Sequence, residues 1–348
     1  ARVLASAAKL RKGERNDPDG PADPAASHSR TDSYRRGLDT RLNLATGALG
    51  TITLGSAFER QQAEPANTAG PLPRRHRVTT GAYAQLAAVR SAVDYALGAR
   101  VDDNSLFGRF VTGRAAAGWR VANGTRLRAS VGNAYKEPGL DEQFDTPFTV
   151  GNPALDPERV TTWEAGLEQA VAADHLLLRA TYFDQRFRDL IQYGFRQGPD
   201  SSDFRNVPDA SARGVELEAR TTGLPGGLSL AASYTALRTR AHSAETSPST
   251  YEQGARLLRR PTHSGSVTIG WTRTGRAHLA AVLNAAATRD DLRFGGAPDF
   301  ATTRVALPGY ATLDLSGDAT VARTRRGGDI VLTARLENAL DKRYEPVV

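Results

Sequence analysis

The chain has 348 residues with 45 basic and 38 acidic side chains, a formal net charge of +7, and no cysteine or methionine. The lack of cysteine excludes disulfides, thiolate metal sites and cysteine nucleophiles in this segment. The longest apolar runs, such as Leu279 to Leu283, are far too short for a membrane-spanning helix.

Apolar and polar residues alternate with a period of two along most of the chain. This pattern is typical of β-strands, because successive side chains point to opposite faces. Val215 and Leu217, for example, alternate with Glu216 and Glu218. We count about fifteen strands, several of them ten or more residues long. In chain order they include Arg2–Leu10, Thr31–Thr46, His175–Ile191, Asn206–Thr221 and Asp329–Leu340.

The links between these strands alternate between short and long. Short links suited to hairpin turns fall at residues 47–50, 123–124, 173–174, 223–227, 274–275 and 326–328. Longer polar segments fall at residues 60–76, 103–108, 137–157, 193–204, 241–260 and 290–308. Short turns on one rim and long loops on the other are typical of outer-membrane barrels with periplasmic turns and extracellular loops. We therefore predict an all-β fold, an antiparallel transmembrane β-barrel.

In such a barrel the apolar face of each strand meets lipid, and the charged face meets a watery lumen. On the lumen face we expect Glu158, Glu164, Glu216 and Glu218 to pair with arginines of neighbouring strands, namely Arg128, Arg179 and Arg220. Aromatic residues near strand ends suit interfacial girdles; they are Tyr83, Trp119, Trp163, Tyr182, Tyr234, Trp271 and Tyr310.

Four segments of the chain carry motifs of one protein family. The run Tyr135-Lys136-Glu137-Pro138, the run Gly-Asn-Pro-Ala-Leu-Asp-Pro-Glu at 151–158 and the pair Trp163-Glu164 resemble the barrel of TonB-dependent outer-membrane receptors. Segments 206–218, 308–314 and 337–344 resemble later strands of that family. We assign mainly structural roles to the motif residues Tyr135, Pro138, Asn152, Pro153, Leu155, Pro157, Glu158, Glu164, Gly214, Glu216, Asn338 and Tyr344.

The resemblance implies a 22-stranded barrel of the Gram-negative outer membrane whose lumen is filled by an N-terminal plug. It also implies energised uptake of a scarce ligand, such as a ferric siderophore or cobalamin, driven by the TonB complex. Residues 1–348 then form a partial barrel of about 15 of the 22 strands. We expect the plug, the TonB-contacting part and the remaining strands to be missing from this chain, which by itself is not competent for transport.

Arginines near the long loops are the candidate ligand-binding residues, because guanidinium groups bind carboxylates, catecholates and phosphates well. They are Arg74, Arg75, Arg77, Arg256, Arg259 and Arg260. Phosphates of lipopolysaccharide, or bulk solvent, suit the same arginines. Haem receptors of the family that this chain resembles carry a histidine between the two motifs, whereas residues 139–151 here contain none. The resemblance therefore disfavours haem, although His76, His242 and His263 could lie near the outer rim. The acidic residues Asp141, Glu142 and Asp145 do not have calcium-loop spacing.

Other functional classes remain open at this point. A passive porin-like or adhesin barrel would have an empty lumen and no plug. A soluble β-rich binding module would be soluble without detergent. An outer-membrane hydrolase is disfavoured, because the six histidines show no metal-ligand spacing and no catalytic Ser, His and acid set is evident. We predict no catalytic residue, metal site or cofactor. The arginines are spread along the whole chain, so we also expect no nucleic-acid partner.

Overall fold

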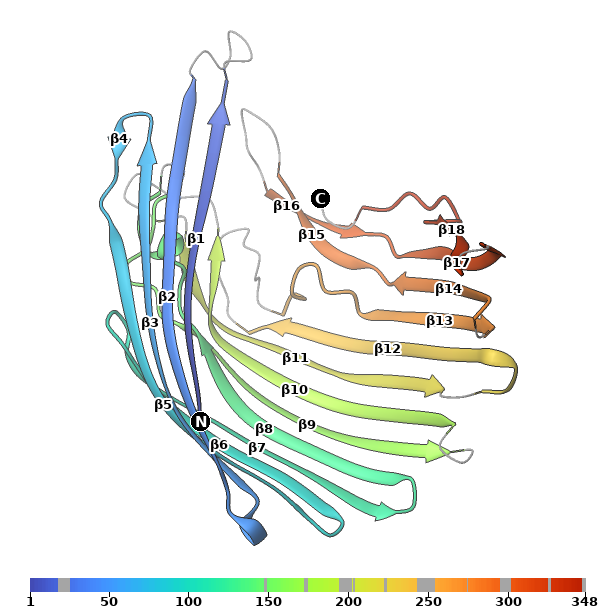
Figure 1. Ribbon diagram of the computed structural model, residues 1–348. Helices are drawn as coiled ribbons and strands as arrows, with labels where there is room; N and C mark the ends of the chain where they lie inside the picture. Colours follow the sequence, from blue (N-terminus) through green and yellow to red (C-terminus); the bar gives the residue numbers. More distant parts are fainter. Residues whose placement is uncertain are drawn as a thin grey trace. The chain divides into compact units, whose positions relative to one another are not determined.

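The computed structural model describes residues 1–17, 26–146, 149–171, 175–193, 202, 204–221, 224–242, 254–273, 275–294, 302–324 and 327–345. These residues form two antiparallel sheets and very little helix (Figure 1). Within the described ranges, no helix has both the length and the apolar character needed to cross a membrane.

The larger sheet has 16 strands, and all but one follow a single hydrogen-bonded path. The exception is the two-residue strand β4 (Gly70–Pro71), which pairs with β3. The path runs through β1 (Arg2–Asn16), β2 (Ser27–Ala45), β3 (Thr51–Asn67), β5 (Arg75–Arg90), β6 (Val93–Asn104), β7 (Gly108–Ala122), β8 (Thr125–Lys136), β9 (Glu158–Val171), β10 (Leu176–Tyr193), β11 (Phe204–Thr221), β12 (Leu228–Ala241), β13 (His263–Arg273), β14 (Ala277–Ala286), β17 (Tyr310–Arg323) and β18 (Asp329–Leu336). The prediction of long antiparallel strands is therefore confirmed; among the described residues the path is not closed into a ring.

Two of the predicted long loops are strands instead. Segment 60–76 continues β3 up to Asn67 and starts β5 at Arg75. Segment 290–308 contains a hairpin of β15 (Arg289–Phe294) and β16 (Thr302–Leu307), which forms the second sheet. Segment 137–157 is a loop as predicted, with one helical turn, α1 (Leu140–Gln143). Segments 193–204 and 241–260 lie largely outside the described residues.

Tight turns join most neighbouring strands. The predicted turn at 47–50 is a 3₁₀ turn, η1 (Gly47–Leu49), and that at 223–227 includes η2 (Pro225–Gly227). The turn at 173–174 lies outside the described residues, as do parts of those at 274–275 and 326–328. Ser91 and Ala92 form a further two-residue link between β5 and β6, where Ser91 has a φ of 53°. The sequence analysis missed this turn because it has no Gly, Asn or Asp.

The chain divides into two compact units. Unit 1 comprises residues 1–117, 131–161 and 187–209, and unit 2 comprises residues 118–130, 162–186 and 210–348. Strands β7 to β11 contribute residues to both units.

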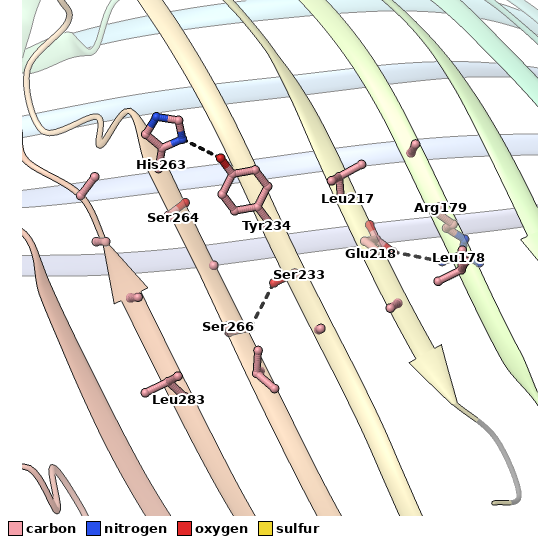
Figure 2. Close-up of a pocket in the computed structure, with 18 of the residues that line it drawn as sticks. Leu178, Arg179, Leu217, Glu218, Ser233, Tyr234, His263, Ser264, Ser266 and Leu283 are labelled. Atoms are coloured by element: carbon pink, nitrogen blue, oxygen red, sulfur yellow. Dashed lines mark hydrogen bonds and ion pairs between the residues drawn. The ribbon is translucent and has the colours of Figure 1, made fainter.

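The two faces of the sheet differ as the alternation predicts, and unit 2 gives a clear example. Leu217 and Tyr234 are direct cross-strand partners and are 44% and 41% exposed. On the opposite face Glu218 binds Arg179, and Ser233 contacts Ser266 (Figure 2).

The buried and exposed residue types are inverted relative to a soluble globular protein. Most large apolar side chains of the strands are exposed, whereas several of the most buried side chains are charged or polar, including Asp32, Arg77, Asp102, Asn104 and Asp291. Such a distribution suits a sheet with lipid on one face and water on the other. A dry apolar interior, which would have contradicted the barrel prediction, is not found among the described residues.

Candidate functional site

A polar groove of about 620 Å³ lies on the charged face of unit 1. Strands β1, β2, β3, β5, β6, β7 and β8 supply its walls together with Glu137. The register aligns the inward-pointing residues of β2, β3, β5 and β6. Its charged and polar lining consists of Ser6, Arg35, Asp39, Glu59, Gln61, Arg77, Thr79, Arg100, Asp102, Thr112, Tyr135 and Glu137. This groove is lined mainly by charged and polar side chains, and we take it as the candidate site.

Each arginine of the groove wall has a carboxylate partner. Arg35 Nε donates to Glu59 Oε2 at 2.8 Å, and Arg100 Nη2 lies 2.6 Å from Asp102 Oδ1. Arg77 Nε lies 2.9 Å from Glu137 Oε2. The groove is thus hydrophilic but largely neutralised by its own ion pairs, so that its walls resemble a wetted lumen lining rather than a strong anion trap.

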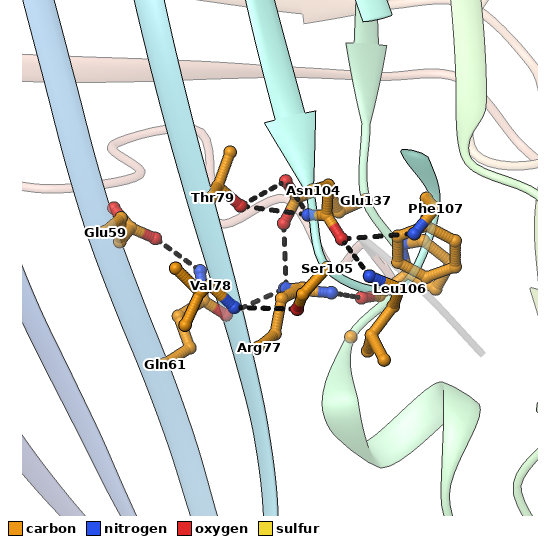
Figure 3. A network of polar contacts seen from close by, with 12 residues as sticks. Glu59, Gln61, Arg77, Val78, Thr79, Asn104, Ser105, Leu106, Phe107 and Glu137 are labelled. Atoms are coloured by element: carbon orange, nitrogen blue, oxygen red, sulfur yellow. Dashed lines mark hydrogen bonds and ion pairs between the residues drawn. The ribbon is translucent and has the colours of Figure 1, made fainter. Parts of the chain in front are cut away.

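Arg77 lies at the centre of a buried polar network (Figure 3). Its side chain is only 5% exposed, and it donates to the Pro138 carbonyl at 2.6 Å and to Gln61 Oε1 at 2.7 Å. Glu137, its ion-pair partner, also accepts from Asn104 at 2.6 Å. Arg77 therefore ties strands β3 and β5 to the start of the 137–157 loop.

Asn104 extends the network to the turn between β6 and β7. Its Oδ1 accepts from the backbone N–H groups of Leu106 and Phe107 at 2.9 and 3.2 Å. Its Nδ2 also donates to Thr79 Oγ1 at 2.9 Å. The 103–108 turn and the 137–157 loop are therefore held by the same set of side chains.

The other two arginines predicted in this region are more accessible. Arg74 is 76% exposed and lies 3.3 Å from a Glu64 carboxylate oxygen, whereas Arg75 is half-buried with its guanidinium 4.5 Å from the centre of the Phe144 ring. Both lie at the first residues of β5 or just before it, where the chain enters from a link on the long-loop rim. Arg74 and Arg75 can thus reach a ligand at the rim more easily than Arg77 can.

In unit 2, two of the predicted arginines form a second polar cluster with the β15–β16 hairpin. Arg259 Nε donates to Asp291 Oδ1 at 2.9 Å, and Arg256 contacts Asp290. Arg304 of β16 donates to the same Asp290 at 2.8 Å. The third predicted arginine, Arg260, is exposed, and its side chain lies 3.5 Å from the Arg259 backbone carbonyl oxygen. The cluster attaches segment 254–260 to the hairpin and leaves Arg260 accessible.

Most motif residues of the 135–164 segment shape the loop and its flanking strands. Pro138, Leu155 and Pro157 are buried, whereas Pro153 is exposed. Tyr135 stacks on Phe110 with a centroid distance of 4.3 Å. Asn152 accepts from the Ala154 N–H at 3.0 Å and donates to the Phe204 carbonyl at 2.9 Å.

The later motif residues have equally local functions. A Cβ on Gly214 would lie 2.2 Å from the Ala236 carbonyl oxygen, so only glycine fits there. Asn338 has a φ of 50° and closes a turn by accepting from the Lys342 N–H at 3.1 Å. Tyr344 stacks on Tyr310 at 4.3 Å.

The expected glutamate–arginine pairs form only in part. Glu218 binds Arg179 at 3.3 Å. Glu158 instead pairs with Lys136 at 3.1 Å, and Glu164 accepts from Ser130 at 2.9 Å. Glu216 has exposed surroundings on β11. The alternation assigns each side chain to a face, but the partner depends on strand register, which the sequence alone does not supply.

The acidic residues of the 137–157 loop serve backbone groups. Glu142 accepts from the Gly139 N–H at 2.7 Å, and Asp145 accepts from the Gly151 N–H at 3.0 Å. Among the described residues, no group of three His, Asp or Glu side chains is arranged to hold a metal ion. His242 and His263 contact Ser211 and Tyr234, respectively.

Several groove residues escaped the sequence analysis, notably Arg35, Glu59, Arg100 and Asp102. Their signal was present, since each occupies a polar position in an alternating strand. Polar positions of this kind occur on every strand, and the sequence does not show which of them lie together. Pairing of β2, β3, β5 and β6 brings these strand residues together.

Comparison with known proteins gives one family and a consistent fold. A family model described as TonB dependent receptor-like, beta-barrel, matches residues 6–339. The siderophore receptor PirA from Acinetobacter baumannii superimposes with a TM-score of 0.74 at 16% identity, covering 98% of this chain and 56% of PirA.

Two further solved structures are similarly close. A variant of the ferric enterobactin receptor PfeA from Pseudomonas aeruginosa gives a TM-score of 0.75 at 19% identity, covering 98% of this chain and 54% of PfeA. The copper transporter OprC gives 0.76 at 17% identity, covering 99% of this chain and 58% of OprC. At these identities the likeness is one of fold. The chain spans just over half the length of the structures that it matches.

Proposed function

Because the chain belongs to the family of TonB-dependent receptor-like β-barrels, which matches it over residues 6–339, we propose that it forms part of a receptor that imports an anionic ferric siderophore. Barrels of this family lie in the outer membrane of Gram-negative bacteria, and so does this chain. The family consists of transport receptors rather than enzymes. In this proposal the complete receptor contains a plug and draws energy from the TonB complex.

The observation that carries the choice of ligand is the difference between wall and rim arginines. Arg35, Arg77 and Arg100 of the groove wall form ion pairs with carboxylates, which neutralise their positive charge. Arg74 also lies 3.3 Å from a Glu64 carboxylate oxygen, but its side chain is 76% exposed and can still reach a ligand. Arg260 is exposed as well, and among the described residues it contacts a backbone carbonyl. Exposed guanidinium groups favour a ligand rich in carboxylate or catecholate oxygens.

Cobalamin is the second ligand class that the sequence motifs suggest. It carries a single phosphodiester and many neutral amides, so it would use exposed arginines less fully than a ferric siderophore. Both classes fit a polar groove whose walls are neutralised internally. An uptake experiment with both ligands can therefore decide between them.

The experiment uses the complete receptor, expressed in a Gram-negative host that lacks its own siderophore and cobalamin receptors. Uptake of radiolabelled iron is measured with a ferric catecholate and a ferric hydroxamate, and labelled cobalamin is measured in parallel. We expect TonB-dependent uptake of a ferric complex. The double variant Arg74→Glu with Arg75→Glu should reduce its binding about tenfold, since charge reversal at a rim opposes an anionic ligand. Arg260→Glu is tested separately in unit 2.

Arg90→Glu is the matched control, because Arg90 is an exposed arginine at the opposite, short-turn end of the same strand β5. It should leave uptake unchanged. If cobalamin but no ferric complex were taken up, the proposed siderophore ligand would be wrong and cobalamin would be the ligand. Diffusion of small solutes that persists without TonB, combined with no saturable uptake, would favour the passive porin-like barrel instead.

A further inference from the structure

Two arginines lie next to each other on the apolar face of unit 2. Arg213 of β11 and Arg238 of β12 are direct cross-strand partners. Side chains directly opposite each other on one face have Cβ atoms about 4.5–5.5 Å apart, and like charges there are destabilising. Both arginines are exposed, and in the described part of the chain neither forms an ion pair with a carboxylate.

The register places this arginine pair on the lipid-facing side of the sheet. Val215 pairs with Ala236, and Leu217 pairs with Tyr234. Because side chains two apart on a strand share a face, Arg213 lies on the same face as Val215 and Leu217. The opposite face carries the Glu218–Arg179 ion pair and therefore points toward water. The two arginines therefore do not line the lumen.

The arginine pair lies toward the extracellular ends of its two strands. Arg213 and Arg238 each lie four residues from Leu217 and Tyr234, toward the ends of β11 and β12 that face the long links. At about 3.3 Å per residue, this separation is about 13 Å. Long links are on the extracellular side of an outer-membrane barrel, so the arginines lie near the outer-leaflet headgroups.

An apolar groove lies on the same face, across β11 to β14 (Figure 2). It has a volume of about 790 Å³, and its outward lining includes small residues between larger ones, such as Ala232, Gly265 and Ala285 flanked by Leu217 and Leu283. Tyr234 lies at the headgroup side, where its hydroxyl contacts His263 Nδ1 at 2.7 Å. The groove therefore lies on the lipid-facing surface, and its lining residue His263 is opposite Ala236, two residues from Arg238 along β12.

We propose that Arg213 and Arg238 clamp a phosphate of a phosphorylated, multiply acylated glycolipid of the outer leaflet, whose acyl chains occupy the groove below. A phosphate between the two guanidinium groups converts a like-charge repulsion into two charge-assisted contacts. Two neighbouring positive charges with no carboxylate select a dianionic headgroup over a zwitterionic one. The proposal depends on outer-membrane location but not on which nutrient is imported, so it can fail while the proposed uptake stands.

The test measures lipid retained by the complete receptor after purification in mild detergent. The probes are lipid A with two phosphates, its fully dephosphorylated form, and phosphatidylglycerol, each added to delipidated receptor and detected by native mass spectrometry. Wild-type receptor should retain bisphosphorylated lipid A at least about tenfold better than the dephosphorylated form, since a charge-assisted contact is worth roughly that factor. The double variant Arg213→Gln with Arg238→Gln should lose this preference.

Arg273→Gln is the matched control, because Arg273 is an exposed arginine on the same face at the short-turn end of β13. It should retain lipid A as wild type does. Heat-modified mobility on a gel verifies that each variant is folded. Equal retention by the double variant and wild type would overturn the proposal, as would equal retention of phosphatidylglycerol and lipid A by the wild type.

A second variant tests the groove separately from the charges. Ala285 pairs with Gly265, so a larger side chain at 285 can lie over the glycine and fill the groove. Ala285→Phe should therefore lower retention of acylated lipid A several-fold while leaving the folded barrel intact. Unchanged retention in this variant would contradict the placement of the acyl chains.

Discussion

Arg77 in unit 1 and the Arg213–Arg238 pair in unit 2 are the same residue type in opposite situations. Arg77 is buried on the charged face, with a carboxylate, an amide and a backbone carbonyl as partners. Arg213 and Arg238 are exposed on the apolar face, opposite each other and without a carboxylate partner in the ranges that the structure describes. An arginine that its own chain supplies with partners therefore stabilises the fold, whereas one without such partners is available to a ligand or a lipid.

The largest effect should come from removing the buried arginine. Arg77→Ala leaves Glu137 with an unpaired charge at 16% exposure and frees the Pro138 carbonyl. Breaking a buried ion pair from one side costs roughly 3–5 kcal/mol. We expect the free energy of unfolding, measured in denaturant with lipid vesicles, to fall by about 3 kcal/mol.

Arg74→Ala is the matched control for that variant, because Arg74 is close in sequence but 76% exposed. Its loss should change stability by less than about 1 kcal/mol. Equal losses in the two variants would show that burial does not separate the two arginines, and the comparison would fail.

A somewhat smaller effect should distinguish the two faces of β13. Ile269 is 53% exposed and lies near the middle of the strand, whereas its neighbour Thr268 points to the opposite face. An arginine on the lipid face costs roughly 2–4 kcal/mol at the bilayer midplane. Ile269→Arg should therefore destabilise the barrel by about that amount in lipid vesicles, and Thr268→Arg by much less. If Thr268→Arg destabilised the barrel more than Ile269→Arg, our assignment of the lipid-facing and water-facing sides would be wrong.

The smallest effect concerns a partly exposed pair on the charged face. Arg179 and Glu218 approach to 3.3 Å, with side chains 37% and 50% exposed. A double-mutant cycle with alanine at both positions should give a coupling energy of about 0.2–1 kcal/mol, which declines at high salt. A coupling above about 2 kcal/mol would mean that water screens this face far less than we infer.

The sequence predicted the strands well because alternation is a local signal. The predicted Asn206–Thr221 strand, for example, is β11 (Phe204–Thr221) in the structure. The prediction was wrong where charged residues or proline were interpreted as a loop. Pro65 lies within β3, paired with Thr31, and Asp290 and Asp291 lie in β15. Proline and acidic residues are compatible with a strand when neighbouring strands supply suitable partners, and those partners are distant in sequence.

The candidate site was predicted less completely than the fold. Arg77 was named for its closeness to a predicted loop, yet its partner Glu137 is 60 residues away and became visible only through tertiary contact. The Arg213–Arg238 pair likewise requires the β11–β12 register. The sequence identifies each charged residue, but strand pairing determines which charged residue lies opposite it.

The β15–β16 hairpin has a consequence for the order in which the sheet assembles. Ala286 at the end of β14 pairs with Tyr310 at the start of β17, so residues 287–309 are bypassed by the ladder (Figure 1). Joining strands across such a segment costs ~2 kcal/mol more chain entropy than joining them across the two-residue link at Ser91 and Ala92. Zippering of consecutive strands should therefore pause at this junction, where a folding catalyst of the membrane would contribute most.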